Sequence, residues 1–236
     1  MTAQHAPAPH LPLRLAVFDV DGTLVDSEHD IVTAMTGAWA KFGLGAPSPA
    51  SVRGIIGLSL VEACAVLLPW ASHTTHRAVA EAYKESFRAM RLLPGAHEPL
   101  FPGVVAALER VEAEGWLLGI ATGKSRRGLD SVLAAHGLAG RFVTLQTADD
   151  NPSKPHPEML LRAAGEAGVP PGRVVMIGDT AYDMAMAGAA GATGIGVSWG
   201  YQGTDALTLA GAHTVIETFE ALPGTLAALA RDWSCD

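Results

Sequence analysis

The sequence predicts an α/β fold whose core is a parallel sheet, interrupted by an α-helical insertion. Short apolar segments alternate with Ala-rich helical segments along most of the 236 residues, as in α/β proteins. The apolar segments have no polar alternate positions, which is typical of parallel strands covered by helices on both faces. Residues 26–98 contain no strand-like segment. We therefore expect a Rossmann-like core with a helical cap domain inserted after the first strand.

Each expected element follows from a local pattern. Within the insertion, the apolar spacing of Val32, Met35, Trp39 and Phe42 predicts a helix, Ser48-Pro49 starts another, and residues 78–93 form a long third one. The expected domains are a disordered Ala/Pro-rich tail (1–13), the core (14–25 and 99–236) and the cap (26–98). Apolar runs predict strands at Leu15–Phe18, Trp116–Ala121, Phe142–Gln146, Val174–Ile177, Gly194–Ser198 and Thr214–Ile216.

Composition and charge narrow the class of protein. With 49% apolar and 17% charged residues, the chain is globular, and it has no apolar run of the roughly 18 residues that a membrane helix needs. The net charge of -8 leaves no basic face for nucleic acid or anionic lipid. The two cysteines and the absence of a secretory signal pattern predict a cytoplasmic protein. These features leave the oligomeric state open.

Polar residues follow four of the expected strands, and the carboxyl ends of parallel strands meet at one edge of a sheet. Four carboxylates against one lysine leave three uncompensated negative charges. Mutual repulsion of this size calls for a cation, and an all-oxygen ligand set favours Mg²⁺ bound together with a substrate phosphate. The residues expected at this edge are Asp19, Asp21, Thr122, Gly123, Lys154, Asp179 and Asp183.

These motifs resemble those of the haloacid dehalogenase-like hydrolases, in the branch with phosphoglycolate phosphatases and β-phosphoglucomutases. DVDGTLVDS, ATGKS, SKPHP and GDTAYD match the four family motifs in order and spacing, and the helical insertion is similar to the family's type-one cap. The resemblance implies a Mg²⁺-dependent phosphatase that acts on a small phosphate ester, either phosphoglycolate-like or a sugar phosphate.

The resemblance also implies a role for each matched residue. Asp19 would be the nucleophile that forms an aspartyl-phosphate and a metal ligand. Asp21 would be the general acid and base, with its backbone carbonyl on the metal. Thr122, with Gly123 beside it, would bind the phosphoryl group, and Lys154 would balance charge. Asp179 would bind Mg²⁺ directly, and Asp183 directly or through water.

Several alternatives remain beside this interpretation. GKS at 123–125 echoes a nucleotide-binding loop, but Leu118 stands where that motif needs glycine. GKS also departs from the commoner family pattern, in which the second motif's Ser or Thr is followed by Asn. A phosphomutase would keep every motif, a dehalogenase would not need Asp21 or Asp179, and a non-catalytic regulatory protein would be free to lose its carboxylates.

Basic residues of the cap are the candidates for reading the rest of the substrate. We expect Arg53 nearest the leaving group, where it could pair with a carboxylate through two hydrogen bonds. Lys84, Arg88 and Arg91 follow helical spacing and are interpreted as one exposed face.

Overall fold

The core is a six-stranded parallel sheet with the order β3-β2-β1-β4-β5-β6. The computed structural model describes residues 12–92 and 98–233, so the expected tail lies almost entirely outside the described residues. The parallel sheet confirms the predicted α/β fold, and the strands begin and end within two residues of the expected positions. The strands are β1 (Leu15–Phe18), β2 (Leu117–Thr122), β3 (Thr144–Thr147), β4 (Val174–Gly178), β5 (Thr193–Val197) and β6 (Thr214–Ile216).

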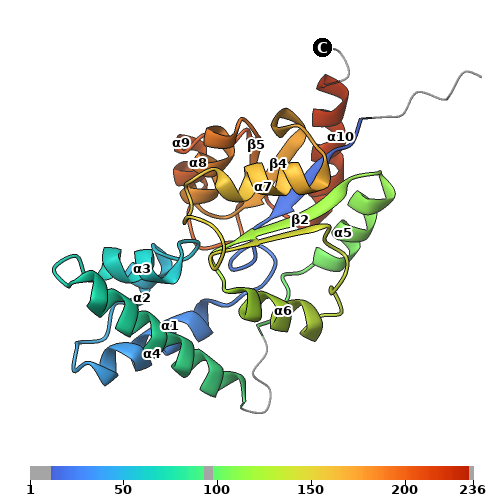
Figure 1. Cartoon of the computed structure of the whole chain (residues 1–236). Coiled ribbons are helices and arrows are strands. Elements are labelled where there is room, and N and C mark those ends of the chain that lie inside the picture. Colours follow the sequence, from blue (N-terminus) through green and yellow to red (C-terminus); the bar gives the residue numbers. More distant parts are fainter. Residues whose placement is uncertain (1–11, 93–97, 234–236) are drawn as a thin grey trace, which may run out of the picture.

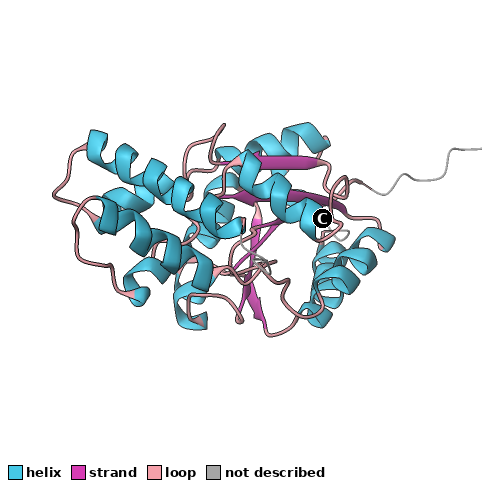
Figure 2. Cartoon of the chain, turned by 90° about the horizontal axis from the view of Figure 1, so that it is seen from below, coloured by secondary structure: helices cyan, strands magenta, loops and turns pink. Residues whose placement is uncertain are grey.

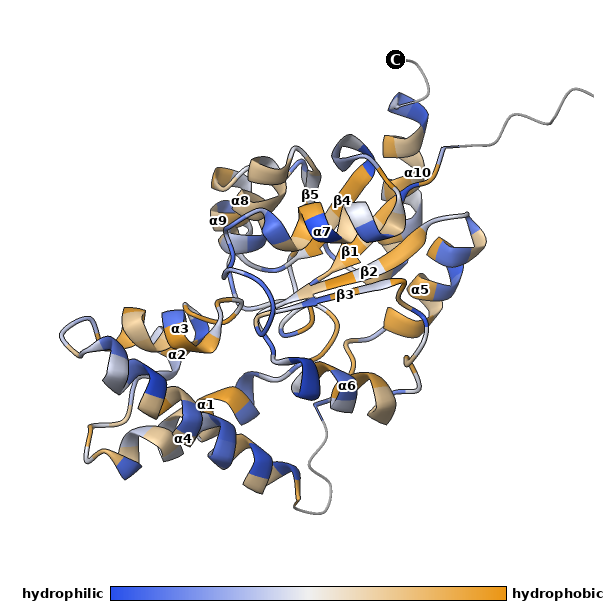
Figure 3. Cartoon of the chain, viewed as in Figure 1, coloured by the Kyte–Doolittle hydropathy of each residue, from blue (hydrophilic) through white to orange (hydrophobic). Residues whose placement is uncertain are grey.

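Helices cover both faces of the sheet (Figures 1 and 2), and the central strands β1, β2 and β4 are strongly apolar (Figure 3). Alternate residues of β1 enter two separate cores. Ala16 and Phe18 pack with α5, α6 and α10, whereas Leu15 and Val17 pack with α7 and α8. The helices after the insertion are α5 (Val104–Ala113), α6 (Arg126–Ala135), α7 (Glu158–Ala167), α8 (Ala181–Ala190), α9 (Thr204–Leu209) and α10 (Leu222–Asp232).

Four helices between β1 and α5 form a separate group beyond the ends of the strands (Figure 1). The group has its own apolar cluster, which includes Met35, Trp39 and Val79. Ser48 caps α2 by accepting a hydrogen bond from the backbone N–H of Ser51, as its sequence predicts. The helices are α1 (Glu28–Lys41), α2 (Pro49–Arg53), α3 (Leu60–Leu67) and α4 (His73–Arg91). Among the described residues, no helix combines the length and the apolar character needed to span a membrane.

Candidate active site

Lys154 joins two of the predicted carboxylates at the end of the sheet. Its Nζ lies 2.9 Å from Asp19 Oδ1 and 2.7 Å from Asp183 Oδ1, and all three side chains are buried. Asp19 directly follows β1, Asp183 lies in the first turn of α8, and Lys154 comes from the loop after β3. Burial alone would lower the pKa of Lys154, but Asp183 and Asp19 outweigh that effect and raise it. The lysine therefore stays charged.

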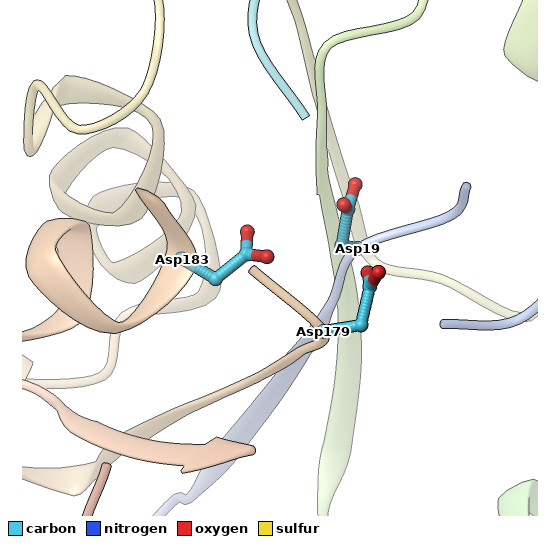
Figure 4. A group of neighbouring side chains, drawn as sticks. All are labelled: Asp19, Asp179 and Asp183. Atoms are coloured by element: carbon cyan, nitrogen blue, oxygen red, sulfur yellow. The ribbon is translucent and has the colours of Figure 1, made fainter. Parts of the chain in front are cut away.

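Asp179, the residue after β4, completes a group of three buried carboxylates with Asp19 and Asp183 (Figure 4). One oxygen from each residue lies within 4.8 Å of the others. The oxygens of Asp179 accept hydrogen bonds from Thr23 Oγ1 (3.0 Å) and from the backbone N–H of Tyr201 (2.9 Å). Burial raises the pKa of Asp179 well above its usual value, and the two neighbouring carboxylates add to this shift.

Two glycines allow the backbone to pack tightly around Asp179. Gly22 has a φ of +82°, and a Cβ at this position would lie 2.3 Å from Asp179 Oδ2. At Gly200 a Cβ would lie 2.1 Å from the Cβ of Asp179. Only glycine fits these contacts. The turn at Asp21-Gly22 therefore changes the direction of the chain after β1 and also leaves room for the Asp179 carboxylate.

Asp19 carries the one carboxylate oxygen in this group that lacks a partner. Its Oδ2 is buried and accepts no hydrogen bond from any described residue. Burial raises the pKa of Asp19 to about 7, with Asp183 and Asp21 adding to the shift and Lys154 opposing it. An unpaired buried carboxylate oxygen is costly. Oδ2 is therefore the atom that a cation or an incoming phosphorus atom would satisfy.

Asp21 belongs to a second ion-pair network beside the first. Lys124 Nζ lies 2.8 Å from Asp21 Oδ1 and 2.7 Å from Glu98 Oε1, and Arg91 Nη2 lies 2.5 Å from Glu98 Oε2. Ser27 Oγ donates a hydrogen bond to the same Asp21 oxygen. Burial alone would lower the pKa of Lys124, but Asp21 and Glu98 raise it. This network holds the Asp21 side chain in one orientation.

Thr122 and Gly123 occupy the end of β2. Thr122 is buried, and its Oγ1 accepts a hydrogen bond of 3.2 Å from the backbone N–H of Lys124. Gly123 faces the loop between α2 and α3: a Cβ there would lie 2.5 Å from the carbonyl oxygen of Leu58 and 2.9 Å from that of Gly57. The absence of a side chain at Gly123 is what allows this loop to approach.

Comparison with known proteins decides the family of this chain. The sequence profile described as haloacid dehalogenase-like hydrolase matches residues 16–197. The chain belongs to the haloacid dehalogenase-like hydrolases. It is 36% identical over 221 residues to a probable phosphatase, IndB, of Dickeya dadantii, with 92% of this chain and 95% of the relative covered. It is also 32% identical over 217 residues to a phosphoglycolate phosphatase of Cupriavidus necator, with coverage of 92% and 94%.

Solved structures show the same fold. A putative haloacid dehalogenase-like hydrolase from Bacteroides fragilis superposes with a TM-score of 0.82 at 26% identity, covering 89% of this chain and 99% of the other. A β-phosphoglucomutase from Clostridium difficile has a TM-score of 0.80 at 19% identity, with coverage of 95% and 100%. The predicted resemblance to the phosphoglycolate phosphatase and β-phosphoglucomutase branch of these hydrolases is confirmed.

The residues of this hydrolase fit Mg²⁺. The ligand set is made of oxygen alone, Asp19 Oδ2 is free, and Asp179 lies beside it. Asp183 already pairs with a cation, Lys154, through one oxygen, and its other oxygen accepts hydrogen bonds from Thr180. Within the described part of the chain, Asp179 accepts hydrogen bonds only from the neutral donors Thr23 and Tyr201. The geometry therefore favours Asp19 and Asp179 as direct ligands, with Asp183 in a supporting position.

The structure does not bring Arg53 to this site. Arg53 Nη1 lies 3.4 Å from Glu28 Oε1 on the surface of the cap, and Arg53 is not among the described residues that line the cavity between cap and core. The face shared by Lys84, Arg88 and Arg91 does line that cavity. Arg88 is exposed, as expected, whereas Lys84 and Arg91 are half-buried beside the cavity.

Lys124 and Glu98 are the site residues that sequence reasoning missed. With Lys124, Glu98 and Arg91 included, five carboxylates face three cationic side chains, and one Mg²⁺ would balance the remaining charge of -2. A signal existed for Lys124: it stands two residues after Thr122 in a motif already assigned to the site. Glu98 had no such signal, since its contact depends on how the chain returns from the cap.

Proposed function

We propose that this phosphoric monoester hydrolase is a Mg²⁺-dependent phosphatase that hydrolyses a small phosphate ester through an aspartyl-phosphate on Asp19. The observation that carries the proposal is the buried Asp19 carboxylate, with Oδ1 held by Lys154 and Oδ2 free. The names of the similar phosphatases support the reaction class. When bound by Asp19 and Asp179, Mg²⁺ would supply positive charge against the phosphoryl oxygens.

Two displacements account for the reaction. In the first, one oxygen of the Asp19 carboxylate bonds to phosphorus while the ester P–O bond breaks, and Asp21 gives a proton to the leaving oxygen. In the second, Asp21 takes a proton from water, the water oxygen bonds to phosphorus, and the acyl-phosphate bond to Asp19 breaks. Thr122 would donate a hydrogen bond to the phosphoryl group, and Lys154 would stabilise its added negative charge.

Two classes of small phosphate ester are candidate substrates. Phosphoglycolate and sugar phosphates both suit the matched motifs, and the name of the Cupriavidus relative supports the first. Recognition of the phosphoglycolate carboxylate by Arg53 would favour this substrate, but Arg53 pairs with Glu28 instead. A phosphomutase would use the same aspartyl-phosphate. It is the second candidate, because the cavity beside Asp21 could shield this intermediate from water.

The test measures phosphate release from p-nitrophenyl phosphate and from a panel of small phosphate esters. Activity should require Mg²⁺, disappear in EDTA and return on adding Mg²⁺. Asp19→Asn keeps the volume of the side chain but removes the nucleophile, so turnover should fall by several orders of magnitude. Asp205→Asn, an exposed carboxylate on α9, is the matched control. Full activity in EDTA, or more than about a tenth of it in Asp19→Asn, would overturn the proposal.

A further inference from the structure

A cavity of about 620 Å³ lies between the cap helices and the core, with Asp21 in its wall. This volume is within the range of pockets that enclose drug-sized molecules. The cap and the core already touch: the backbone N–H of Ser59 donates to Ser153 Oγ (2.8 Å), and Tyr182 Oη donates to the carbonyl oxygen of Gly54 (3.1 Å). The cavity is therefore larger than a two-carbon acid such as phosphoglycolate requires.

The walls of this cavity concentrate positive charge. Six of the chain's 16 lysines and arginines line it, although the whole chain carries a net charge of -8. Among the described residues, only three carboxylates line the same cavity, those of Asp21, Glu62 and Asp149. Such a local excess raises the concentration of anions at the cavity. The six cationic residues are Arg77, Lys84, Arg88, Arg91, Lys124 and Arg127.

Three of the six cations form ion pairs with described residues, and three do not. Lys84 pairs with Glu81, while Arg91 and Lys124 pair with Glu98. The remaining three arginines form no ion pair with any carboxylate in the described part of the chain: Arg77, Arg88 and Arg127. An arginine binds a carboxylate or a phosphate through two parallel hydrogen bonds.

Arg88 and Arg127 come from opposite walls of the cavity. Arg88 lies on the cap helix α4 and Arg127 on the core helix α6. Arg88 is one helical turn from Arg91, which is connected to Asp21 only through Glu98 and Lys124. Arg88 is thus separated from Asp21 by the length of this network, and Arg88 and Arg127 are both exposed. Apolar side chains such as Phe87 and Leu58 also line the cavity.

We propose that the substrate is a phosphomonoester whose leaving group has an apolar or aromatic body and a second anionic group, and that Arg88 and Arg127 bind this group. The inference rests on the proposed phosphatase function. A carboxylate and a second phosphate share the chemistry that arginine recognises. Phosphoglycolate is then a poor substrate, because its carboxylate lies too close to its phosphate to reach both arginines.

The experiment compares kcat/KM for phenyl phosphate, 4-carboxyphenyl phosphate, 1,4-phenylene bisphosphate and phosphoglycolate in Mg²⁺. In the wild type, at least one of the two anionic aryl esters should exceed phenyl phosphate about tenfold or more, the size of effect that a charge-assisted hydrogen bond supplies. Whichever anionic ester is preferred identifies the group as a carboxylate or a phosphate. In Arg88→Ala/Arg127→Ala the ratio of anionic to neutral ester should fall about tenfold.

Two further variants complete the test. Arg88→Lys/Arg127→Lys should retain part of the ratio, because the charge remains while the paired hydrogen bonds are lost. Arg126→Ala should leave it unchanged, since Arg126 pairs with Asp130 on α6 and does not line this cavity. Equal kcat/KM for neutral and anionic esters, or a ratio unaffected by the double alanine variant, overturns this inference alone. Hydrolysis of phosphoglycolate but of none of the aryl phosphates also overturns this inference alone. If the wild type hydrolyses none of these esters and none of the wider panel, the proposed function fails, and the inference fails with it.

Discussion

At the scale of single residues, Lys124 connects the reacting group to the frame of the protein. Its Nζ contacts both Asp21 and Glu98, and its side chain is only 10% exposed. Asp19, Asp179 and Lys154 were predictable because each follows a strand, and the ends of parallel strands converge. The contacts of Lys124 and Arg53 were not predictable, because a sequence pattern does not identify the partner of a long side chain.

Lys124→Met tests this connection. The change keeps the aliphatic length but leaves Asp21 oriented by Ser27 alone and Glu98 paired only with Arg91. We expect kcat to fall by about tenfold to a hundredfold, and the free energy of unfolding to fall by about 1–3 kcal/mol as buried charges lose a partner. Steady-state kinetics and urea unfolding measure the two effects.

The control for this variant is Lys41→Met, which removes an exposed lysine paired with Glu85 on the cap surface. It should change both quantities little, because exposed ion pairs contribute between zero and about 1 kcal/mol. A Lys124→Met enzyme with wild-type kcat would show that Asp21 needs no support from Lys124.

At the scale of elements, the strands were predictable to within about two residues because most of them are apolar runs, although Thr and Gln make up most of β3. The predicted first residue of a strand was off by one or two where a buried apolar side chain lies just before the hydrogen-bonded strand. Trp116 and Phe142 are buried and apolar, yet both precede their strands, β2 and β3. The sequence placed the helical insertion, but not the direction in which α4 faces, because the cationic spacing of α4 suits solvent and a cavity equally well.

Contact between the cap loop and the core depends on Gly123. A Cβ at this position would lie 2.5 Å from the Leu58 carbonyl oxygen, so Gly123→Asn should push the loop away from β2. We expect KM to rise severalfold or more and kcat to fall, because the cap closes less completely over the substrate. Gly188→Ala on α8, where no atom lies within 4 Å of a Cβ, is the control. Unchanged kinetics in Gly123→Asn would contradict the importance of this contact.

At the scale of the whole molecule, the buried carboxyl group of Asp19 makes both metal binding and the free energy of unfolding depend on pH. The pKa of Asp19 is raised from 3.8 to about 7, so the folded protein keeps a proton that the unfolded chain releases. In EDTA, the free energy of unfolding should therefore fall as pH rises between these two values. Mg²⁺ must displace that proton, so it should stabilise the protein more at pH 8 than at pH 6.

Thermal unfolding with and without Mg²⁺ at the two pH values measures this coupling. The rise in Tm on adding Mg²⁺ should be larger at pH 8 in the wild type, and the pH dependence should be weaker in Asp19→Asn, which has no proton to lose at this position. An equal or larger rise at pH 6 in the wild type would contradict the assignment of Asp19 as a metal ligand.

The central claim is that the phosphoryl group passes through Asp19, and trapping it in Asp21→Asn tests the claim most directly. This variant lacks the base that activates water, while p-nitrophenyl phosphate has a leaving group that needs little protonation. After mixing with Mg²⁺ and acid quenching, we predict a burst of about one nitrophenolate per protein and the added mass of one phosphoryl group on the peptide that contains Asp19. Absence of both the burst and the added mass, or a phosphoryl group on another residue, would contradict the account.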